Sequence, residues 1–185
     1  MPKLKILALI VAISWIVSAA VGVDDDRLPI KFQAKYQLQE GSRTGRVMIV
    51  CEIPEGRHIY SLQQTSPPGP TKIQVADSNA FKTTDAFAAN HKPTVIEHDP
   101  VFETRLEQFD GKVTFSAPIE LATGAQLEKQ TIELVVNCQV CSDSGCVLVR
   151  NKKIEARFGG YFDPNAEKEG NQPPSSKDAG GGKDN

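Results

Sequence analysis

The sequence has few aromatic residues and no excess of positive charge. Phe, Trp and Tyr together account for 6% of its 185 residues, and the formal net charge is -2. Proteins that bind nucleic acid or an anionic membrane usually present a basic patch, and single-strand binders add aromatic side chains on which bases stack. Because neither feature is found, we exclude nucleic acid as a partner.

Two further absences restrict the possible folds and the possible reaction types. Trp15 is the only tryptophan, and it lies in the N-terminal leader described below, so a core built around a buried tryptophan, as in antibody domains, is excluded. The G-x-S-x-G, P-loop and H-E-x-x-H motifs are also missing. Their absence argues against a serine hydrolase, a P-loop nucleotidase and a zinc protease.

The first 20 residues have the pattern of a secretory signal peptide. Lys3 and Lys5 precede an uncharged run, and small residues at 18–20 follow it. The alternative is an uncleaved anchor, because the uncharged stretch extends to Val23 before three aspartates begin. We expect cleavage, no stable membrane insertion afterwards, and a periplasmic or secreted location, where disulfides can form.

The rest of the chain alternates apolar and polar residues, which is typical of half-buried β-strands. Turns rich in Gly, Pro and Asn separate the short strands, so the sequence predicts an all-β domain, an antiparallel β-sandwich, over residues 27–162. The expected strands lie at 30–34, 47–53, 58–62, 72–75, 113–117, 132–138, 147–150 and 154–158.

Two segments depart from this alternation. Residues 77–109 have weak periodicity, and only one helical turn, at 85–90, fits there. Loops of this length in a compact domain usually carry function or motion. Residues 163–185 are rich in Asn, Glu, Lys, Pro, Ser and Gly, and we predict a disordered tail because such a composition buries too little apolar surface.

Three of the four cysteines, Cys138, Cys141 and Cys146, fall within nine residues. Cys138 and Cys141 have the C-x-x-C spacing of thioredoxin-like proteins, in which a helix N-terminus activates the thiolate. The residues after Cys141 instead predict a turn into another strand. Cys141 and Cys146 would then pair across a hairpin, and both pairings stay open at this point.

Alternation also assigns the cysteines to faces of the sheet. Cys51 is in phase with Val47 and Ile49, and Cys138 continues the inward-facing series of its own strand, whereas Cys141 falls on the opposite parity and is predicted to face solvent. A Cys51–Cys138 disulfide would close a loop of about 88 residues and stabilise the fold by roughly 4.6 kcal/mol, against roughly 2.2 kcal/mol for the Cys141–Cys146 ring.

These differences suggest different uses for the two pairs. Cys51 and Cys138 are candidates for a structural disulfide, or else buried free thiols. A small exposed ring that adds little stability suits a bond that opens and closes. The alternative is that both bonds are structural.

A zinc site is the remaining use of the cysteines. Together with His58, His91 or His98 they would provide enough ligands. The spacing lacks a second well-formed C-x-x-C, and oxidising conditions would convert the thiols to disulfides. We therefore expect no metal and no cofactor, and we place the three histidines in loops and on the surface.

Three strings resemble the N-terminal periplasmic domain of the thiol:disulfide interchange protein DsbD. They are CEIPEGRHIYS at 51–61, PPGPTKI at 67–73 and CSDSGC at 141–146, in this order after a signal peptide. The resemblance covers about residues 30–158. It implies an immunoglobulin-like sandwich with one redox-active cysteine pair.

Carried over by position, the resemblance makes Cys141 and Cys146 the redox pair. Tyr60 would lie beside the pair, and a cap loop within residues 99–102, beginning at Asp99, would shield the disulfide with the ring of Phe102. The implied function is thiol:disulfide interchange with protein partners, either thioredoxin-like proteins or a membrane reductase. The alternative is a non-catalytic, protein-binding sandwich stapled by structural disulfides.

The predicted tail can be tested by deletion. Removing residues 163–185 should leave the melting temperature almost unchanged, because the segment buries too little apolar surface to contribute. Thermal unfolding followed by circular dichroism measures this change. A large fall in melting temperature would mean that the tail docks on the sandwich.

Overall fold

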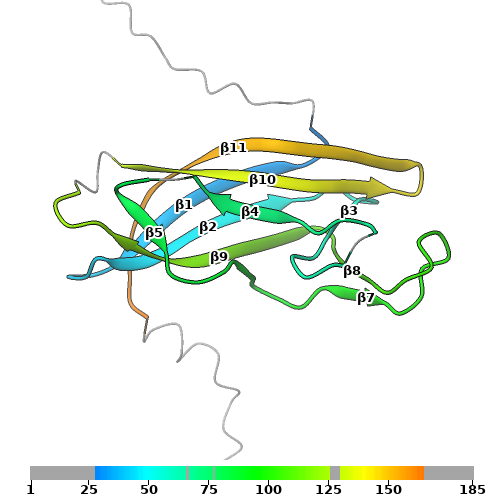
Figure 1. Ribbon diagram of the computed structural model, residues 1–185, viewed down its shortest axis with the longest axis horizontal. Helices are drawn as coiled ribbons and strands as arrows, with labels where there is room; N and C mark the ends of the chain where they lie inside the picture. The colour runs from blue at the N-terminus through cyan, green and yellow to red at the C-terminus, as the bar shows by residue number, and fades with distance from the viewer. Residues whose placement is uncertain (1–27, 66, 77, 126–129, 165–185) are drawn as a thin grey trace, which may run out of the picture.

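The computed structural model describes residues 28–65, 67–76, 78–125 and 130–164, which form eleven strands and no helix (Figure 1). The predicted signal peptide and nearly all of the predicted tail lie outside these residues. The strands are β1 (Lys31–Gln39), β2 (Thr44–Glu52), β3 (His58–Tyr60), β4 (Lys72–Val75), β5 (Phe81–Thr83), β6 (Ala88–Ala89), β7 (Thr94–Ile96), β8 (Leu106–Phe109), β9 (Lys112–Leu121), β10 (Thr131–Ser142) and β11 (Gly145–Phe162).

The all-β, immunoglobulin-like prediction is confirmed, but three local predictions are wrong. The expected helical turn at 85–90 is replaced by bends and the short strand β6, which pairs with β9. The segment 77–109 contributes four strands. The two strands expected at 147–150 and 154–158 are one strand, β11, with a local irregularity at Asn151, where φ is 49° and the backbone N–H donates to Asn137 Oδ1.

Hydrogen bonds join the strands in the order β5-β9-β2-β1-β11-β10-β3-β8-β7, while β4 pairs with β10. Nearly all pairs are antiparallel, as predicted. The exception is β1 with β11, which run parallel from the Lys35–Arg157 pair onward. Alternation of side chains gives the inward face of a strand but not its neighbour, so the sequence could not predict this pairing.

One core connects the two long pairs, β2 with β9 and β10 with β11. Every second residue of β2, β9 and β10 is buried, as the alternation predicted. The inward position of Cys51 is confirmed, and Cys138 is also buried. The buried members from these strands include Val47, Ile49, Val113, Phe115, Ala117, Ile119, Ile132, Leu134, Val136 and Val140.

Two leucines on the paired strands β10 and β11 give a matched test of this core. Leu134 is fully buried, whereas Leu148 is 49% exposed. Leu134→Ala should lower the free energy of unfolding by about 2–5 kcal/mol, because it removes buried methyl groups and leaves a cavity. Leu148→Ala should change it by less than about 0.5 kcal/mol. Urea unfolding measures both, and equal losses would contradict the assignment of the core.

Candidate functional site: a capped disulfide at the end of a hairpin

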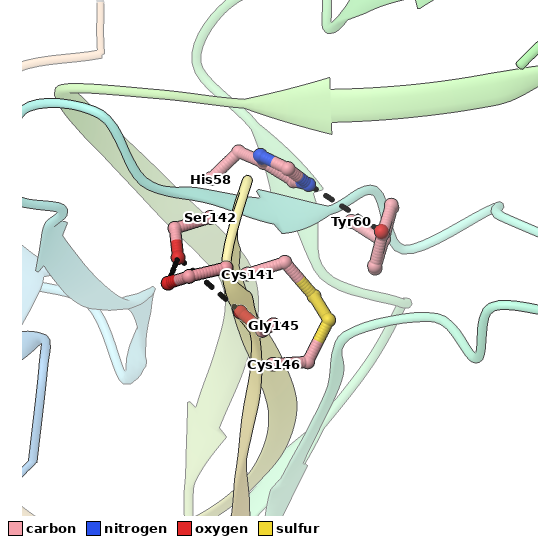
Figure 2. The surroundings of a disulfide bond; sticks show 7 residues. His58, Tyr60, Cys141, Ser142, Gly145 and Cys146 are labelled. Atoms are coloured by element: carbon pink, nitrogen blue, oxygen red, sulfur yellow. Dashed lines mark hydrogen bonds between the residues drawn. A yellow bond between two sulfur atoms is a disulfide. The ribbon is translucent and has the colours of Figure 1, made fainter. Parts of the chain in front are cut away.

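The β10–β11 hairpin brings Cys141 and Cys146 together. They are direct cross-strand partners next to the turn, with Cα atoms 4.0 Å apart, and they form a disulfide (Figure 2). Gly145 has φ 139°, a conformation that favours glycine, and it lets β11 start directly after the turn. The structure therefore has the hairpin pairing, and the alternative C-x-x-C pairing of Cys138 with Cys141 is not formed.

The two cysteines of the disulfide differ in exposure. Cys141 is only 2% exposed, whereas Cys146 lies in the exposed first part of β11. The prediction that Cys141 faces solvent is therefore wrong. Its parity is as expected, opposite to the core, but Tyr60, Leu106 and the partly buried Phe102 pack over this second face. Cys146 is therefore the more accessible of the two cysteines.

The cover over Cys141 is a loop built around Asp99. One carboxylate oxygen, Asp99 Oδ1, accepts the backbone N–H groups of Val101 and Phe102, both at 2.9 Å. The backbone of Asp99 also pairs with Thr104 and Glu103 at 2.9 and 2.8 Å. The side chain and the backbone of Asp99 together therefore fix the turn that carries Phe102 over the disulfide.

Phe102 rests on Tyr60, with ring centroids 6.4 Å apart and an interplanar angle of 84°. Edge-to-face contacts of this kind stabilise aromatic pairs beyond the area they bury. Tyr60 is itself fixed, because its carbonyl accepts a 2.6 Å hydrogen bond from the buried Thr71 hydroxyl. Burial, and secondarily the charge of Asp99, raise the pKa of the Tyr60 phenol, so Tyr60 is neutral at physiological pH.

His58 also borders the disulfide, which the sequence analysis missed. It is half-buried on β3, directly opposite Cys141, and a 3.3 Å hydrogen bond joins its Nε2 to the Tyr60 hydroxyl (Figure 2). Burial lowers the pKa of His58, while Asp143, Asp110 and Asp99 oppose the shift. The placement of all three histidines on the surface is wrong for His58, although His91 and His98 are exposed. Its alternation with Tyr60 was the available clue.

All five predicted site residues line one cleft of about 490 Å³ beside the disulfide. They are Tyr60, Asp99, Phe102, Cys141 and Cys146. The structure thus places the predicted residues together, while their roles in exchange stay predictions. The cleft has an apolar wall from Phe102 and Leu106 and an acidic rim from Asp99 and Asp143.

Cys51 and Cys138 are free thiols buried in the core. Of the two alternatives considered for them, the disulfide is not formed. Burial raises the pKa of Cys138 to about 12, and burial together with the neighbouring Cys138 raises the pKa of Cys51 still further. Because the thiolate is the nucleophile, neither thiol competes with the hairpin pair. Among the described residues, no three His, Cys, Asp or Glu side chains form a group that could hold a metal.

Comparison with protein families agrees with the resemblance seen in the sequence. The model for the N-terminal domain of the thiol:disulfide interchange protein DsbD matches residues 25–157. The chain belongs to the DsbD N-terminal family. Comparison with curated protein sequences gave no match.

One solved structure supports the fold of this DsbD-family chain. The N-terminal periplasmic domain of ScsB from Proteus mirabilis superposes with a TM-score of 0.51 at 15% identity, covering 78% of this chain. The chain spans about half of that structure, 53%. The periplasmic chaperone SfaE matches with a TM-score of only 0.22, at 17% identity, over 76% of this chain and 62% of its own. In the described residues, no helix has the length and apolar character needed to cross a membrane.

The cap can be tested through two neighbouring residues of its loop. Phe102→Ala should speed reduction of the disulfide by glutathione several-fold, because access to sulfur is one of the factors that control exchange rates. Val101→Ala is the control, since Val101 is 79% exposed at the same turn and should leave the rate unchanged. Stopped-flow measurements give both rates, and equal rates would mean that Phe102 shields nothing.

Proposed function

We propose that this domain is a thiol–disulfide exchange module that passes electrons between partner proteins through Cys141 and Cys146. The observation that carries the proposal is the split exposure of the pair: Cys146 is open to attack while Cys141 is held under a cap. A disulfide that only stabilises the fold does not need one exposed and one covered cysteine. The family to which the chain belongs is named for thiol:disulfide interchange, which supports the same function.

The proposed exchange has two steps. A partner thiolate attacks Cys146 Sγ, the bond between the two sulfurs breaks, and its electron pair leaves on Cys141 Sγ, which takes up a proton. The partner's second thiolate then attacks the sulfur of the partner's first cysteine in the mixed disulfide. This releases Cys146 as a thiolate, which is also protonated. The partner dithiol loses two electrons and two protons, and the cysteine pair gains them. The same steps in reverse pass the electrons to an oxidised protein.

The surroundings of Cys141 favour the protonated product. A covered site disfavours a thiolate, and nearby carboxylates oppose negative charge. Cys141 is covered, and Asp99 and Asp143 line its cleft. We therefore expect the reduced pair to carry thiols rather than a stable thiolate, so that it reacts with a docked partner more readily than with stray oxidants.

Location and partners follow from this chemistry. Exchange requires a compartment in which protein disulfides persist, and the N-terminal leader favours the periplasm or secretion. The partners would be thioredoxin-like proteins or a membrane reductase, with no cofactor on this chain. The solved relative of similar fold is a periplasmic domain, which supports the location.

A redox titration together with trapping tests the function. The reduction potential should lie well above the roughly -300 mV that is typical of structural disulfides in secreted proteins. Cys141→Ala leaves the exposed Cys146 thiol, which should attack the disulfide of an oxidised partner protein and stay joined to it as a mixed disulfide, while the partner's second cysteine leaves as a thiol. Cys146→Ala, with only the covered Cys141, is the matched control and should trap less. A potential far below that range, with no trapping by either variant, would favour the stapled binding module.

A further inference from the structure

The strand that carries Cys146 has an open edge beside it. On one side, β11 pairs with β10 from Gly145 to Arg157. On the other side, its partner is β1, and that pairing begins only at Arg157. Within the described part of the chain, no strand pairs with the outer edge of β11 next to Cys146.

The register shows which backbone groups face this edge. In an antiparallel pair, directly opposed residues alternate between hydrogen-bonded pairs, with Cα atoms about 5.5 Å apart, and non-hydrogen-bonded pairs, about 4.5 Å apart. Cys141 and Cys146 are 4.0 Å apart and lie one position from the Ser142–Gly145 pair that closes the two-residue turn. They therefore form a non-hydrogen-bonded pair.

It follows that the backbone N–H and C=O of Cys146 point away from β10, toward the open edge. Two residues on, Leu148 opposes Gln139 in the same register and points its backbone groups the same way. The corresponding groups of Cys141 point to β3, where Cys141 pairs with His58. The exposed cysteine thus lies at the start of a short row of outward-facing donors and acceptors.

We propose that this edge, at Cys146 and Leu148, docks an extended segment of the partner protein that lies beside the partner's reactive cysteine, by addition of a strand to β11. The inference rests on the proposed exchange function and names how the partner is held. Because the cap covers Cys141, the attacking sulfur must come to Cys146, and the open edge is continuous with that atom. Strand addition gives affinity through main-chain hydrogen bonds, whatever the partner's side chains are.

The side chains along the edge fit a protein segment rather than a small thiol. Leu148 lies on the same face as Cys146 and is 49% exposed, and Val147 between them is 42% exposed. Large exposed apolar residues beside unpaired backbone favour association. Glutathione is too short to cover this row, so its reaction should not depend on it.

Proline at Leu148 tests the edge without breaking the hairpin. The Leu148 N–H faces outward, so proline removes a docking donor and no bond to β10. With reduced thioredoxin as the probe, Leu148→Pro should slow exchange about threefold to tenfold, the loss expected for one hydrogen bond. The Leu148→Ala control keeps the N–H and should be slowed less. The rate with glutathione should be the same for all three proteins.

The outcomes separate the docking inference from the exchange function. If the wild-type protein does not exchange with reduced thioredoxin, the proposed function fails. If it does exchange and Leu148→Pro is as fast as Leu148→Ala, only the docking inference fails. Self-association of wild-type protein through this edge, detected by sedimentation and abolished in Leu148→Pro, would also overturn it, because a second copy would then be the occupant.

A peptide experiment on the wild-type protein avoids any question about folding of the proline variant. The probe is a cysteine-containing octapeptide in two methylated copies. One copy carries backbone N-methyl groups at its odd positions, and the other carries them at its even positions. In a paired strand only alternate N–H groups face the neighbour, so methylation should slow mixed-disulfide formation for one copy and not the other. Equal rates for both methylated copies and the unmodified peptide would overturn strand addition.

Discussion

The register between β10 and β11 determines both the core and the site. It turns alternate residues of β10 inward, from Ile132 to Val140, and so builds one side of the core. The same register sets Cys141 opposite Cys146 at the turn. A shift of one residue would expose the inward series and separate the two sulfurs. The apolar pattern of β10 therefore holds the cysteines in place, and the stability of the core keeps the site geometry intact.

The face of the β10–β11 hairpin that points away from the core is also covered, which distinguishes this disulfide from one that only cross-links two strands. A sandwich normally leaves its outer faces to solvent, but here the Asp99 turn brings Phe102 against Tyr60 on the outer side. This small cluster, which also contains Leu106 and Cys141, is separate from the main core. Because the cluster is small and separate, displacing it would expose little apolar surface and leave the main core intact. Long core strands and a small, separate cover are combined in one site.

Sequence patterns predicted the strands well because their alternation reflects one buried face. The strand at 72–75 has the observed bounds, and Cys51 faces the core as expected. Alternation did not predict the cover over Cys141. That side chain is buried by a loop about forty residues earlier in the chain, and the pattern of its own strand carries no sign of this loop. His58 was also missed: it shares a face of β3 with Tyr60, but alternation alone does not show that this face is covered. The cap residues were found through the family resemblance, not through periodicity.

The separation of the free and bonded cysteines has a consequence for oxidative folding. In an oxidising compartment all four thiols could react before folding, and the native partners are only five positions apart. Short segments close more readily than long ones, because the entropic cost of closure grows with loop length. The hairpin register selects Cys141–Cys146 over the still shorter Cys138–Cys141 closure by placing Cys141 opposite Cys146, and this bond can form before the sheets assemble. Once they do, Cys51 and Cys138 are enclosed among apolar side chains, and thiol shuffling has no attacking group left inside the molecule.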